Sequence, residues 1–444
     1  MDWTKLLSTR RLGKLKQTDG DQGDPRTDFT RDWDRIVFSS AFRRLQDKTQ
    51  VFPLAKSDYV RTRLTHSLEV ASVGRSLGMQ AADVILRKQP DLKGRISAHD
   101  IGAIVSTACL AHDIGNPPFG HAGESAIQEW FMGNDRALEG LSEQEQQDLL
   151  KFEGNAQGFR SLATLQFFPQ LGGMQLTSAV LGTFTKYPRA SVVDAPQSTG
   201  ISGKKFGFMH SEAELFQGLA DELGLLKKAG SSMAWHRHPL AFLVEAADDT
   251  CYHIMDVEDG FKAGVVSFDE LRSLYEPWLT DVQLAKADRY DNLQRRAEYF
   301  RALTVGEVIK EAIAVFDANY DGLMSGSFDD ELSARFQRAS HFKAFKDLAK
   351  KKVYSARPVI EVEACGFEVI GGLLDAFVNA VQVKAKGGSV GKVRSRTLLG
   401  LLPSGGAGAT SSYEQLLVVT DYVSGMTDSF AVELYQKIRG ISLP

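Results

Sequence analysis

The sequence predicts a mainly α-helical fold, and three observations support that class. Apolar residues recur at the spacing of an α-helix over long stretches, most clearly in residues 65–88, 97–111 and 240–260. Strand-like and helix-like segments do not alternate along the chain, so a parallel α/β sheet is not expected. No internal repeat is found, and a short strand pair is expected only around residues 359–362.

The composition is that of an ordinary globular protein, with 43% hydrophobic and 24% charged residues in a chain of 444. The net charge of −4 gives no overall field that attracts nucleic acid or an anionic membrane, although local Arg/Lys clusters can bind phosphates. Three scattered cysteines in apolar settings predict reduced core residues of a cytoplasmic protein. No apolar segment approaches the roughly 20 residues of a membrane helix, and no signal peptide is recognised, so no membrane is expected.

The N-terminal region is predicted to be an irregular arm followed by an amphipathic helix. Residues 1–30 are polar with little periodicity, which predicts the arm. Residues 34–51 have apolar positions at helical spacing, and four cationic side chains accompany them: Arg35, Arg43, Arg44 and Lys48. These cations can form a solvated face, as most such patterns do, or bind a phosphate.

Two further helices bring histidine and aspartate side chains to a turn. The first is expected over residues 65–88, with Thr65 as its N-cap and His66 in its first turn. The second runs from about residue 97 to 111 and ends at His112-Asp113, two metal-ligand types side by side.

A Gly/Pro-rich turn, residues 115–118, leads from these ligands to His121 and Glu124. A sharp turn after a buried helix places such side chains at the wall of a cavity. His121 and Glu124 are three residues apart, so they share one face of the next helix. The alternative is a helix C-terminus followed by an ordinary polar loop.

The segments between residues 133 and 208 are predicted from their composition. Residues 133–151 are acidic and Gln-rich, which predicts an exposed insertion. Residues 153–160 are dense in polar groups flanked by glycine, which favours a ligand-facing segment. A helix is expected over residues 175–186, ending at Lys186-Tyr187, and residues 189–208 are expected to form a loop.

Residues 240–260 form the third key helix. Asp248, Tyr252 and Asp256 are spaced four apart, so they stack on one face. Their neighbours are mostly apolar, and a partly buried carboxylate needs a partner, which a cation supplies. The alternative is an ordinary salt-bridged helix. Beyond it, helices are expected to include residues 292–303, 367–382 and 412–439, with Gly/Ser-rich loops within residues 384–412.

Four side chains on the three key helices form a predicted metal-ligand set: His66, His112, Asp113 and Asp248. Two imidazoles and two carboxylates suit a divalent ion such as Mn, Mg, Co, Ni or Fe. A mixed set of this kind leaves room for water and substrate, as catalytic sites do.

In these motifs the sequence resembles the bacterial deoxyguanosine triphosphate triphosphohydrolases, a family of the HD-domain superfamily. The pattern is His…His-Asp…Asp on helices, with the string His112-Asp-Ile-Gly-Asn-Pro-Pro-Phe-Gly-His-Ala-Gly-Glu124 at its centre. Further matching strings begin at Asp34, Phe42, Arg63, Glu153, Ala247 and Asp421. The resemblance spans about residues 30–440. It implies an HD-type helical core over residues 31–275, a helical region over 276–444 that completes the site and the assembly, and hydrolysis of a dNTP to deoxynucleoside and inorganic triphosphate.

The resemblance also implies a role for each candidate residue. The family's metal ligands fall on His66, His112, Asp113 and Asp248, and its catalytic pair falls on His121 and Glu124. Asp248 is preferred to Asp249 because only Asp248 is followed by tyrosine and then aspartate at four-residue steps. The implied substrate contacts are Gln50, Val51, Arg63, Asn155, Lys186, Tyr187, Tyr252 and Asp256.

The resemblance further implies a homo-oligomer, commonly a hexamer, with a dNTP activator or a single-stranded nucleic-acid effector as further partners. It places no residue in 189–208 or 384–412, so base preference stays open. One alternative function is an HD phosphodiesterase or phosphatase on another nucleotide. Another is a non-catalytic protein that binds nucleotides or single-stranded nucleic acid. P-loop chemistry is not expected, because the chain has no G-x-x-x-x-G-K-[ST].

Overall fold

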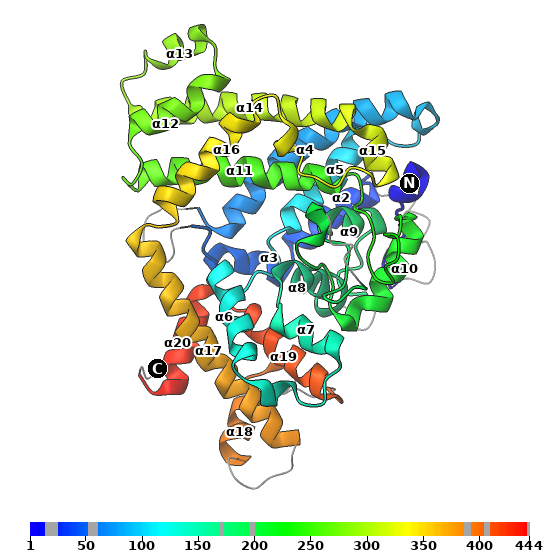
Figure 1. The fold of residues 1–444 in the computed structure, drawn as a ribbon, viewed down its shortest axis with the longest axis vertical. Coiled ribbons are helices and arrows are strands. Elements are labelled where there is room, and N and C mark those ends of the chain that lie inside the picture. The colour runs from blue at the N-terminus through cyan, green and yellow to red at the C-terminus, as the bar shows by residue number, and fades with distance from the viewer. Residues whose placement is uncertain are drawn as a thin grey trace.

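The helices assemble into a mainly α-helical molecule, which confirms the predicted fold class (Figure 1). The computed structural model describes residues 1–13, 25–51, 61–167, 172–194, 200–385, 392–403 and 409–441. Within these ranges the β structure consists of isolated bridges. The α-helices are α1 (Trp3–Leu6), α2 (Asp28–Val37), α3 (Ser40–Arg44), α4 (Arg63–Lys88), α5 (Ala98–Ala111), α6 (His121–Met132), α7 (Glu143–Leu150), α8 (Gly154–Arg160), α9 (Ser178–Phe184), α10 (Ala213–Leu223), α11 (Ala241–Lys262), α12 (Phe268–Tyr275), α13 (Asp281–Ala287), α14 (Leu293–Ala318), α15 (Tyr320–Ser325), α16 (Ala339–Leu348), α17 (Arg357–Ala385), α18 (Lys392–Leu399), α19 (Ser412–Ser424) and α20 (Asp428–Arg439).

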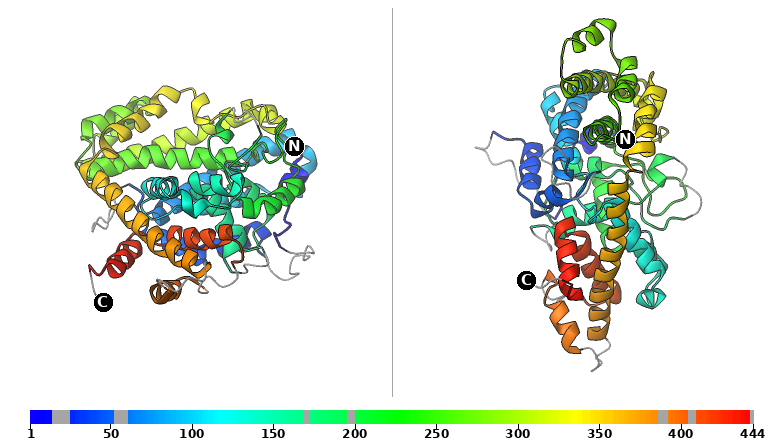
Figure 2. Two further views of the ribbon diagram at one scale, coloured as in Figure 1. Left: turned by 60° about the horizontal axis from the view of Figure 1, so that its bottom comes forward. Right: turned by 90° about the vertical axis from the view of Figure 1, so that its left-hand side faces the viewer.

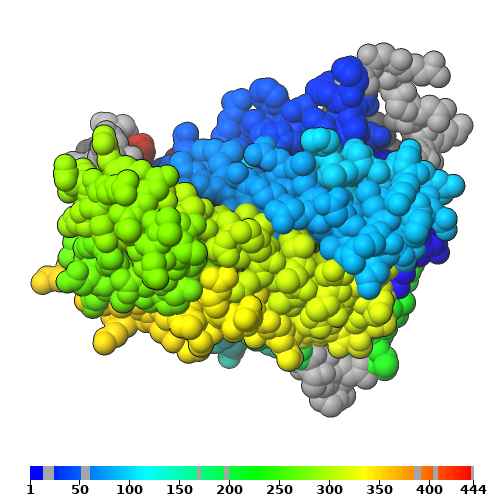
Figure 3. All heavy atoms as spheres, turned by 90° about the horizontal axis from the view of Figure 1, so that it is seen from above, coloured from blue at the N-terminus to red at the C-terminus, as the bar shows by residue number. Residues whose placement is uncertain are grey.

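The larger hydrophobic core lies among α4, α5, α11 and α14. α4 packs along α5, and both α11 and α14 pack against α4. From above, α4 and α14 lie side by side on one face (Figure 3). At Gly78 a Cβ atom would lie 2.9 Å from the Cα atom of Gly102, so glycine lets the backbones of α4 and α5 approach closely.

A second hydrophobic core lies among α6, α17, α19 and α20. α17 packs against α6 and against the last two helices, which lie beside it in both views of Figure 2. The two cores are separate clusters of buried side chains. His121 and Glu124, on α6, therefore belong to a different packing unit from the candidate ligands on α4 and α11.

Capping interactions set the starts of the helices that carry candidate ligands. At the start of α4, the Thr62 hydroxyl accepts from the Thr65 N–H and the Thr65 hydroxyl accepts from the Thr62 N–H. The N-cap is therefore Thr62, three residues before the predicted one. Ser97 caps α5 in the same reciprocal way with Asp100. Such caps satisfy amide groups that the first helical turn leaves without partners.

Two predictions for the N-terminal region are wrong. The arm is not wholly irregular, because Asp2 caps the short helix α1, which buries Trp3 and Leu6. The single helix expected over residues 34–51 is broken after Val37. The Ser39 hydroxyl accepts from the Phe42 N–H at 3.1 Å and starts α3, so a side-chain cap overrides the continuous helical pattern.

Two further local predictions are wrong. The expected insertion at residues 133–151 contains α7, and it is not merely exposed because Asp148 and Leu149 are buried. The strand pair expected at 359–362 lies inside α17. Its β-branched residues favoured a strand, but Val359 is buried and Val362 partly buried while Ile360 and Glu361 between them are exposed, which is the spacing of a helix face. The loops predicted within 384–412 fall partly outside the described residues.

One described helix, α17, is long and apolar enough to cross a membrane by length and composition, which the sequence argument did not anticipate. Its most apolar window, within Arg357–Lys384, has a mean hydropathy of 1.5, and 61% of that window is buried inside the protein. Buried core helices pass the same test, so this is weak evidence for a membrane.

His238 ties the first helix to the larger core. Its Nε2–H donates to the carbonyl oxygen of Leu6 at 3.0 Å, and its Nδ1 accepts from the Leu240 N–H at 3.1 Å. Burial lowers the pKa of His238 to about 4. The neutral ring satisfies both contacts, whereas a second ring proton would face the Leu240 N–H.

We expect this contact to make the free energy of unfolding fall between pH 6.5 and about pH 4. In that window the unfolded chain binds a proton at His238 that the folded chain excludes, which removes up to about 3 kcal/mol of stability. His238→Gln should lack this dependence. Denaturant unfolding at pH 7 and pH 4.5 gives the free energy of unfolding of wild type and of His238→Gln. If wild type lost no more stability than the variant between these two pH values, the expectation would be contradicted.

Candidate functional site

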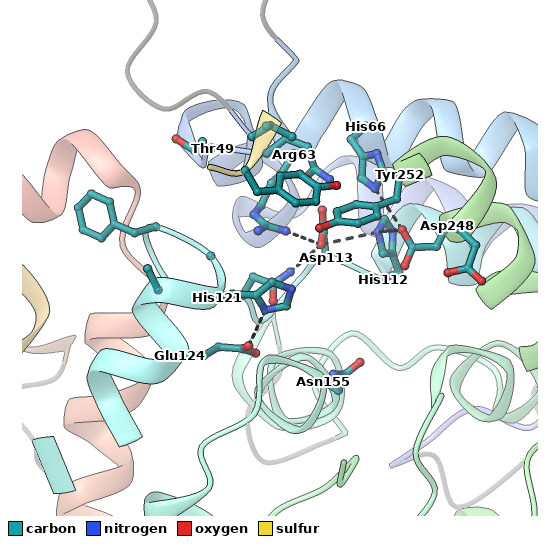
Figure 4. A pocket seen from close by; sticks show the side chains of 18 of the residues that line it. Thr49, Arg63, His66, His112, Asp113, His121, Glu124, Asn155, Asp248 and Tyr252 are labelled. Atoms are coloured by element: carbon teal, nitrogen blue, oxygen red, sulfur yellow. Dashed lines mark hydrogen bonds and ion pairs between the residues drawn. The ribbon is translucent and has the colours of Figure 1, made fainter. Parts of the chain in front are cut away.

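A cavity of about 570 Å³ lies where the two cores meet, and nearly all predicted site residues line it (Figure 4). Its size is within the range of small-molecule sites. The predicted residues on its wall are Gln50, Val51, Arg63, His66, His112, Asp113, His121, Glu124, Asn155, Lys186, Tyr187, Asp248 and Tyr252. Asp256 is not among them.

Three of the four predicted metal ligands form a close cluster. Ligand atoms of His66, His112 and Asp248 all lie within 4.8 Å of one another. The Asp248 Oδ1 atom is 3.3 Å from the Nε2 atom of His66 and 3.5 Å from that of His112. These side chains come from α4, the end of α5 and α11, as predicted. They can hold a divalent ion.

The ring of His112 is oriented for ligation by a second contact. Its Nδ1–H donates to the carbonyl oxygen of Cys109 at 2.6 Å, which leaves Nε2 toward Asp248. Burial alone would lower the pKa of His112, but the carboxylates of Asp113 and Asp248 raise it to about 9. The site therefore favours positive charge at this point, as a cation-binding site requires.

Asp113 lies beside this cluster with one oxygen engaged and one free. Its Oδ1 accepts from Arg63 Nη1 at 2.7 Å and from Asn116 Nδ2 at 2.6 Å. Its Oδ2 is buried and has no hydrogen-bond partner among the described residues. A buried carboxylate oxygen without a partner is costly, and a metal ion would satisfy it. The donor set thus fits the predicted ion.

Arg63 was predicted as a phosphate contact, and the structure shows that it also holds a candidate ligand. It is buried and bonded to Asp113. A Cβ atom at Gly120 would lie 2.5 Å from its Nη2 atom, so this position, where φ is +58°, needs glycine. The Gly/Pro turn therefore packs directly on the arginine that orients Asp113.

The turn that separates the two parts of the site is fixed by close backbone packing. At Gly115, where φ is +110°, a Cβ atom would lie 2.2 Å from the amide nitrogen of Gly158 on α8. Beyond the turn, His121 begins α6 and Glu124 follows one helical turn later. The Glu124 Oε1 atom accepts from the Gly154 N–H at 2.7 Å, which anchors it to α8.

His121 and Glu124 form a hydrogen-bonded pair on the cavity wall (Figure 4). The Nδ1 atom of His121 is 2.9 Å from Glu124 Oε2, and 77% of the His121 side chain is exposed. Burial would raise the pKa of Glu124, but the bond to His121, the charge of Lys205 and the Gly154 N–H lower it. Glu124 is therefore a carboxylate that can orient the ring, with His121 Nε2 left for proton transfer.

Lys186 and Tyr187 also line the cavity and are held there by a buried network. Lys186 Nζ lies 3.2 Å from Glu245 Oε1, and Arg237 donates to the other oxygen of Glu245 at 2.7 Å. The Arg237 guanidinium also lies 5.6 Å from the centre of the Tyr187 ring. Burial would lower the pKa of Lys186, but Glu245 raises it above its usual range. Lys186 therefore stays cationic.

The predicted face of α11 is only partly exposed to the cavity. Tyr252 lines it, with the ring of Tyr354 stacked 5.7 Å away. Asp256 is buried and accepts from the Tyr354 hydroxyl at 2.5 Å. Its role as a substrate contact stays a prediction.

Several cavity residues were missed by the sequence reasoning. Lys205 lies 3.0 Å from Glu153 Oε2 and 3.8 Å from Glu124 Oε2, in a segment read only as a loop. Lys346 and Lys350 line the cavity from α16 and the turn after it. Their four-residue spacing was the available signal, but most such cations lie on solvated faces.

The chain is similar to known proteins over its whole length. Residues 63–153 match the family model of the HD domain, and residues 331–437 match that of the phosphohydrolase-associated domain. The chain is 43% identical to a deoxyguanosinetriphosphate triphosphohydrolase-like protein of Synechocystis and 37% identical to one of Pseudomonas aeruginosa, over the full length of both chains in each case. It is 32% identical to a deoxyguanosinetriphosphate triphosphohydrolase of Klebsiella pneumoniae, over 93% of this chain and 94% of the relative.

Proposed function

Because this chain belongs to the deoxyguanosinetriphosphate triphosphohydrolase-like family of HD-domain hydrolases, we propose that it hydrolyses a dNTP to deoxynucleoside and inorganic triphosphate. One observation carries the proposal. The His121–Glu124 pair faces the same cavity as the His66, His112 and Asp248 cluster. A pocket that only binds phosphate needs the cluster of His66, His112 and Asp248 but not the His121–Glu124 pair.

The charges around the cavity suit a polyphosphate. Lys186, Lys205, Lys346 and Lys350 all line it. A triphosphate carries several negative charges, and fixed cations in a partly enclosed cavity bind such an anion more strongly than they would in open water. Base recognition and the predicted activator, nucleic-acid effector and hexamer stay predictions.

The proposed reaction joins a water oxygen to the α-phosphorus, breaks the bond to the 5′-oxygen and releases the water proton to solvent, from which His121 later regains the proton that it donates. His66, His112, Asp113 and Asp248 would hold a divalent ion, which polarises a phosphoryl oxygen when bound. His121 Nε2 donates the proton that the leaving 5′-oxygen takes up, and Glu124 holds the ring by its Nδ1 atom. The products are the deoxynucleoside and triphosphate.

Gln50 and Tyr252 are the proposed contacts to the sugar. Gln50 lines the cavity, and its Oε1 atom is buried without a hydrogen-bond partner among the described residues. A sugar hydroxyl would satisfy that oxygen. Tyr252, backed by the stacked Tyr354 ring, can pack beneath the deoxyribose and leave no space for a 2′-hydroxyl.

Product identification tests the proposal. The purified chain is incubated with each dNTP and Mn or Mg, with and without a second dNTP, and the products are separated by chromatography. We expect deoxynucleoside and inorganic triphosphate in equal amounts. Orthophosphate or pyrophosphate as the product would favour the HD phosphodiesterase or phosphatase alternative, and no product from any dNTP would contradict enzyme activity on this substrate class.

A further inference from the structure

The polar motif at residues 421–428 has no part in the proposed reaction, yet the structure connects it to the cavity. It spans the end of α19 and the start of α20. Two of its side chains, Asp421 and Asp428, make several hydrogen bonds each to segments far away in the sequence. These two carboxylates have different partners.

Asp428 joins two segments of the cavity wall. It is buried, with 1% of its surface exposed. Its Oδ2 accepts from the Thr49 N–H at 2.9 Å and from the Thr49 hydroxyl at 2.6 Å. Its Oδ1 accepts from the Phe119 N–H at 2.9 Å. Thr49 and Phe119 both line the cavity.

Lys48 makes a second link between the same parts of the molecule. Its buried ammonium group donates to the carbonyl oxygen of Asn116 at 2.5 Å and to that of Ser424 at 2.8 Å. Asn116 belongs to the turn that leads to His121, and Ser424 is the last residue of α19. Lys48 therefore fastens the turn to the C-terminal helices rather than contacting solvent or phosphate.

The positions of these contacts relate them to catalysis. Thr49 immediately precedes Gln50 and Val51, the predicted sugar and base contacts, and Phe119 lies two residues before His121. Phe119 has a φ of 63°, which is unfavourable for a residue other than glycine and persists only when surrounding contacts impose it. The bond from its N–H to Asp428 is one such contact.

We propose that Asp428 and Lys48 are positioning residues, through which the C-terminal helices fix the turn that carries His121 relative to the segment that carries Gln50. This inference rests on the proposed function for its catalytic consequence, but the contacts themselves can be tested without activity. Neither residue lines the cavity. Asp428 acts through Thr49 and the Phe119 N–H, and Lys48 acts through the backbone carbonyl oxygens of Asn116 and Ser424.

Asp421 offers a matched control on the same pair of helices. Its carboxylate accepts from Arg160 at two atoms and from Gln157 at one, each at 2.8 Å. It thus makes as many hydrogen bonds as Asp428, but Arg160 and Gln157 do not line the cavity. Loss of either carboxylate weakens the attachment of the C-terminal helices, whereas only loss of Asp428 releases cavity segments.

The test compares Asp428→Asn with Asp421→Asn in the full chain. Asn keeps one acceptor oxygen, but its amide nitrogen cannot accept a hydrogen bond, so either Thr49 or the Phe119 N–H loses its partner. We expect kcat to fall about 10- to 100-fold in Asp428→Asn, with KM raised less, because a small displacement of a catalytic group has an effect of this size. The kcat of Asp421→Asn should stay within about threefold of the wild-type value, while its Tm is similar to that of Asp428→Asn. Equal losses in both variants would overturn the proposal.

Amide hydrogen exchange gives a readout that does not depend on dNTP turnover. Peptides covering residues 45–51 and 113–120 should exchange faster in Asp428→Asn and as in wild type in Asp421→Asn. If Asp428→Asn fails to fold, Thr49→Val replaces it, because valine lacks the hydroxyl that donates to Asp428. Thr49→Ser, which keeps that hydroxyl, is then the control. Unchanged exchange in these peptides would refute the positioning role, even if the wild type proved inactive toward every dNTP.

Discussion

Replacement of His121 by alanine is expected to lower dNTP turnover by about 10²–10⁴-fold, the usual contribution of a positioned general acid. The His121 ring reaches the cavity wall, is held at Nδ1 by Glu124 and presents its other nitrogen for proton transfer. Because 77% of the side chain is exposed, the substitution should leave the Tm close to that of wild type. Turnover at saturating substrate and metal measures the effect.

Two variants sharpen this test. His99 is also an exposed histidine in the first turn of a helix, α5, but it does not line the cavity, so His99→Ala should retain turnover. Turnover of Glu124→Gln should lie between that of His121→Ala and that of His99→Ala, because its amide keeps the shape but loses the charged acceptor that holds the His121 ring at Nδ1. Full turnover in His121→Ala, with its metal content unchanged, would rule out the acid role.

The parts of the site that could be predicted are local in sequence or regular in spacing. His112-Asp113, the Gly/Pro turn and the His121–Glu124 pair lie within a single stretch of the chain. Asp248 and Tyr252 could be assigned to one helical face because the period of the helix fixes which residues share a face. The structure places His112, Asp113, His121, Glu124, Asp248 and Tyr252 on one cavity, and of the turn between them only Asn116 lines it.

The parts that could not be predicted depend on tertiary packing. Lys48 belongs to a cationic pattern that suggested a solvated face or a phosphate contact, yet its ammonium group is buried against two carbonyl oxygens. Tyr354 and Lys350 reach the cavity from a segment distant in sequence from the predicted site residues, where no local pattern distinguishes them from surface residues. Burial of Asp256 behind Tyr354 likewise follows from packing between helices and not from the spacing along α11.

The two hydrophobic cores hold different groups of site residues. The candidate ligands are fixed by the larger core, through α4, α5 and α11, and His121 and Glu124, the proposed proton-transfer pair, are fixed by the second core, through α6. The distance between them is therefore set by how the cores join, at the Gly/Pro turn and the Lys48 and Asp428 contacts. A change at this junction can lower turnover without touching either set of side chains.

Asp248→Asn is expected to remove measurable turnover and to weaken metal binding by at least about 10²-fold, since even residues that only support a ligand contribute 10- to 100-fold. The carboxylate is the member of the cluster that lies within 3.5 Å of both imidazoles. Burial would raise its pKa, but the two histidines lower it well below the usual range, so it is charged when it meets the ion. An amide oxygen keeps the shape but supplies no charge.

The neighbouring Asp249 provides the control, because comparing the two variants shows which of the two aspartates is a metal ligand. Burial raises the pKa of Asp249 to about 7, and its Oδ2 accepts from the Ser333 hydroxyl at 3.1 Å; Asp249 lines the cavity but is not a member of the cluster with His66 and His112. Asp249→Asn mimics a form that the protein already populates near neutral pH, so it should retain bound metal. Metal content after gel filtration, measured by mass spectrometry, separates the two variants. Equal metal content in Asp248→Asn and wild type would show that this carboxylate is not a ligand.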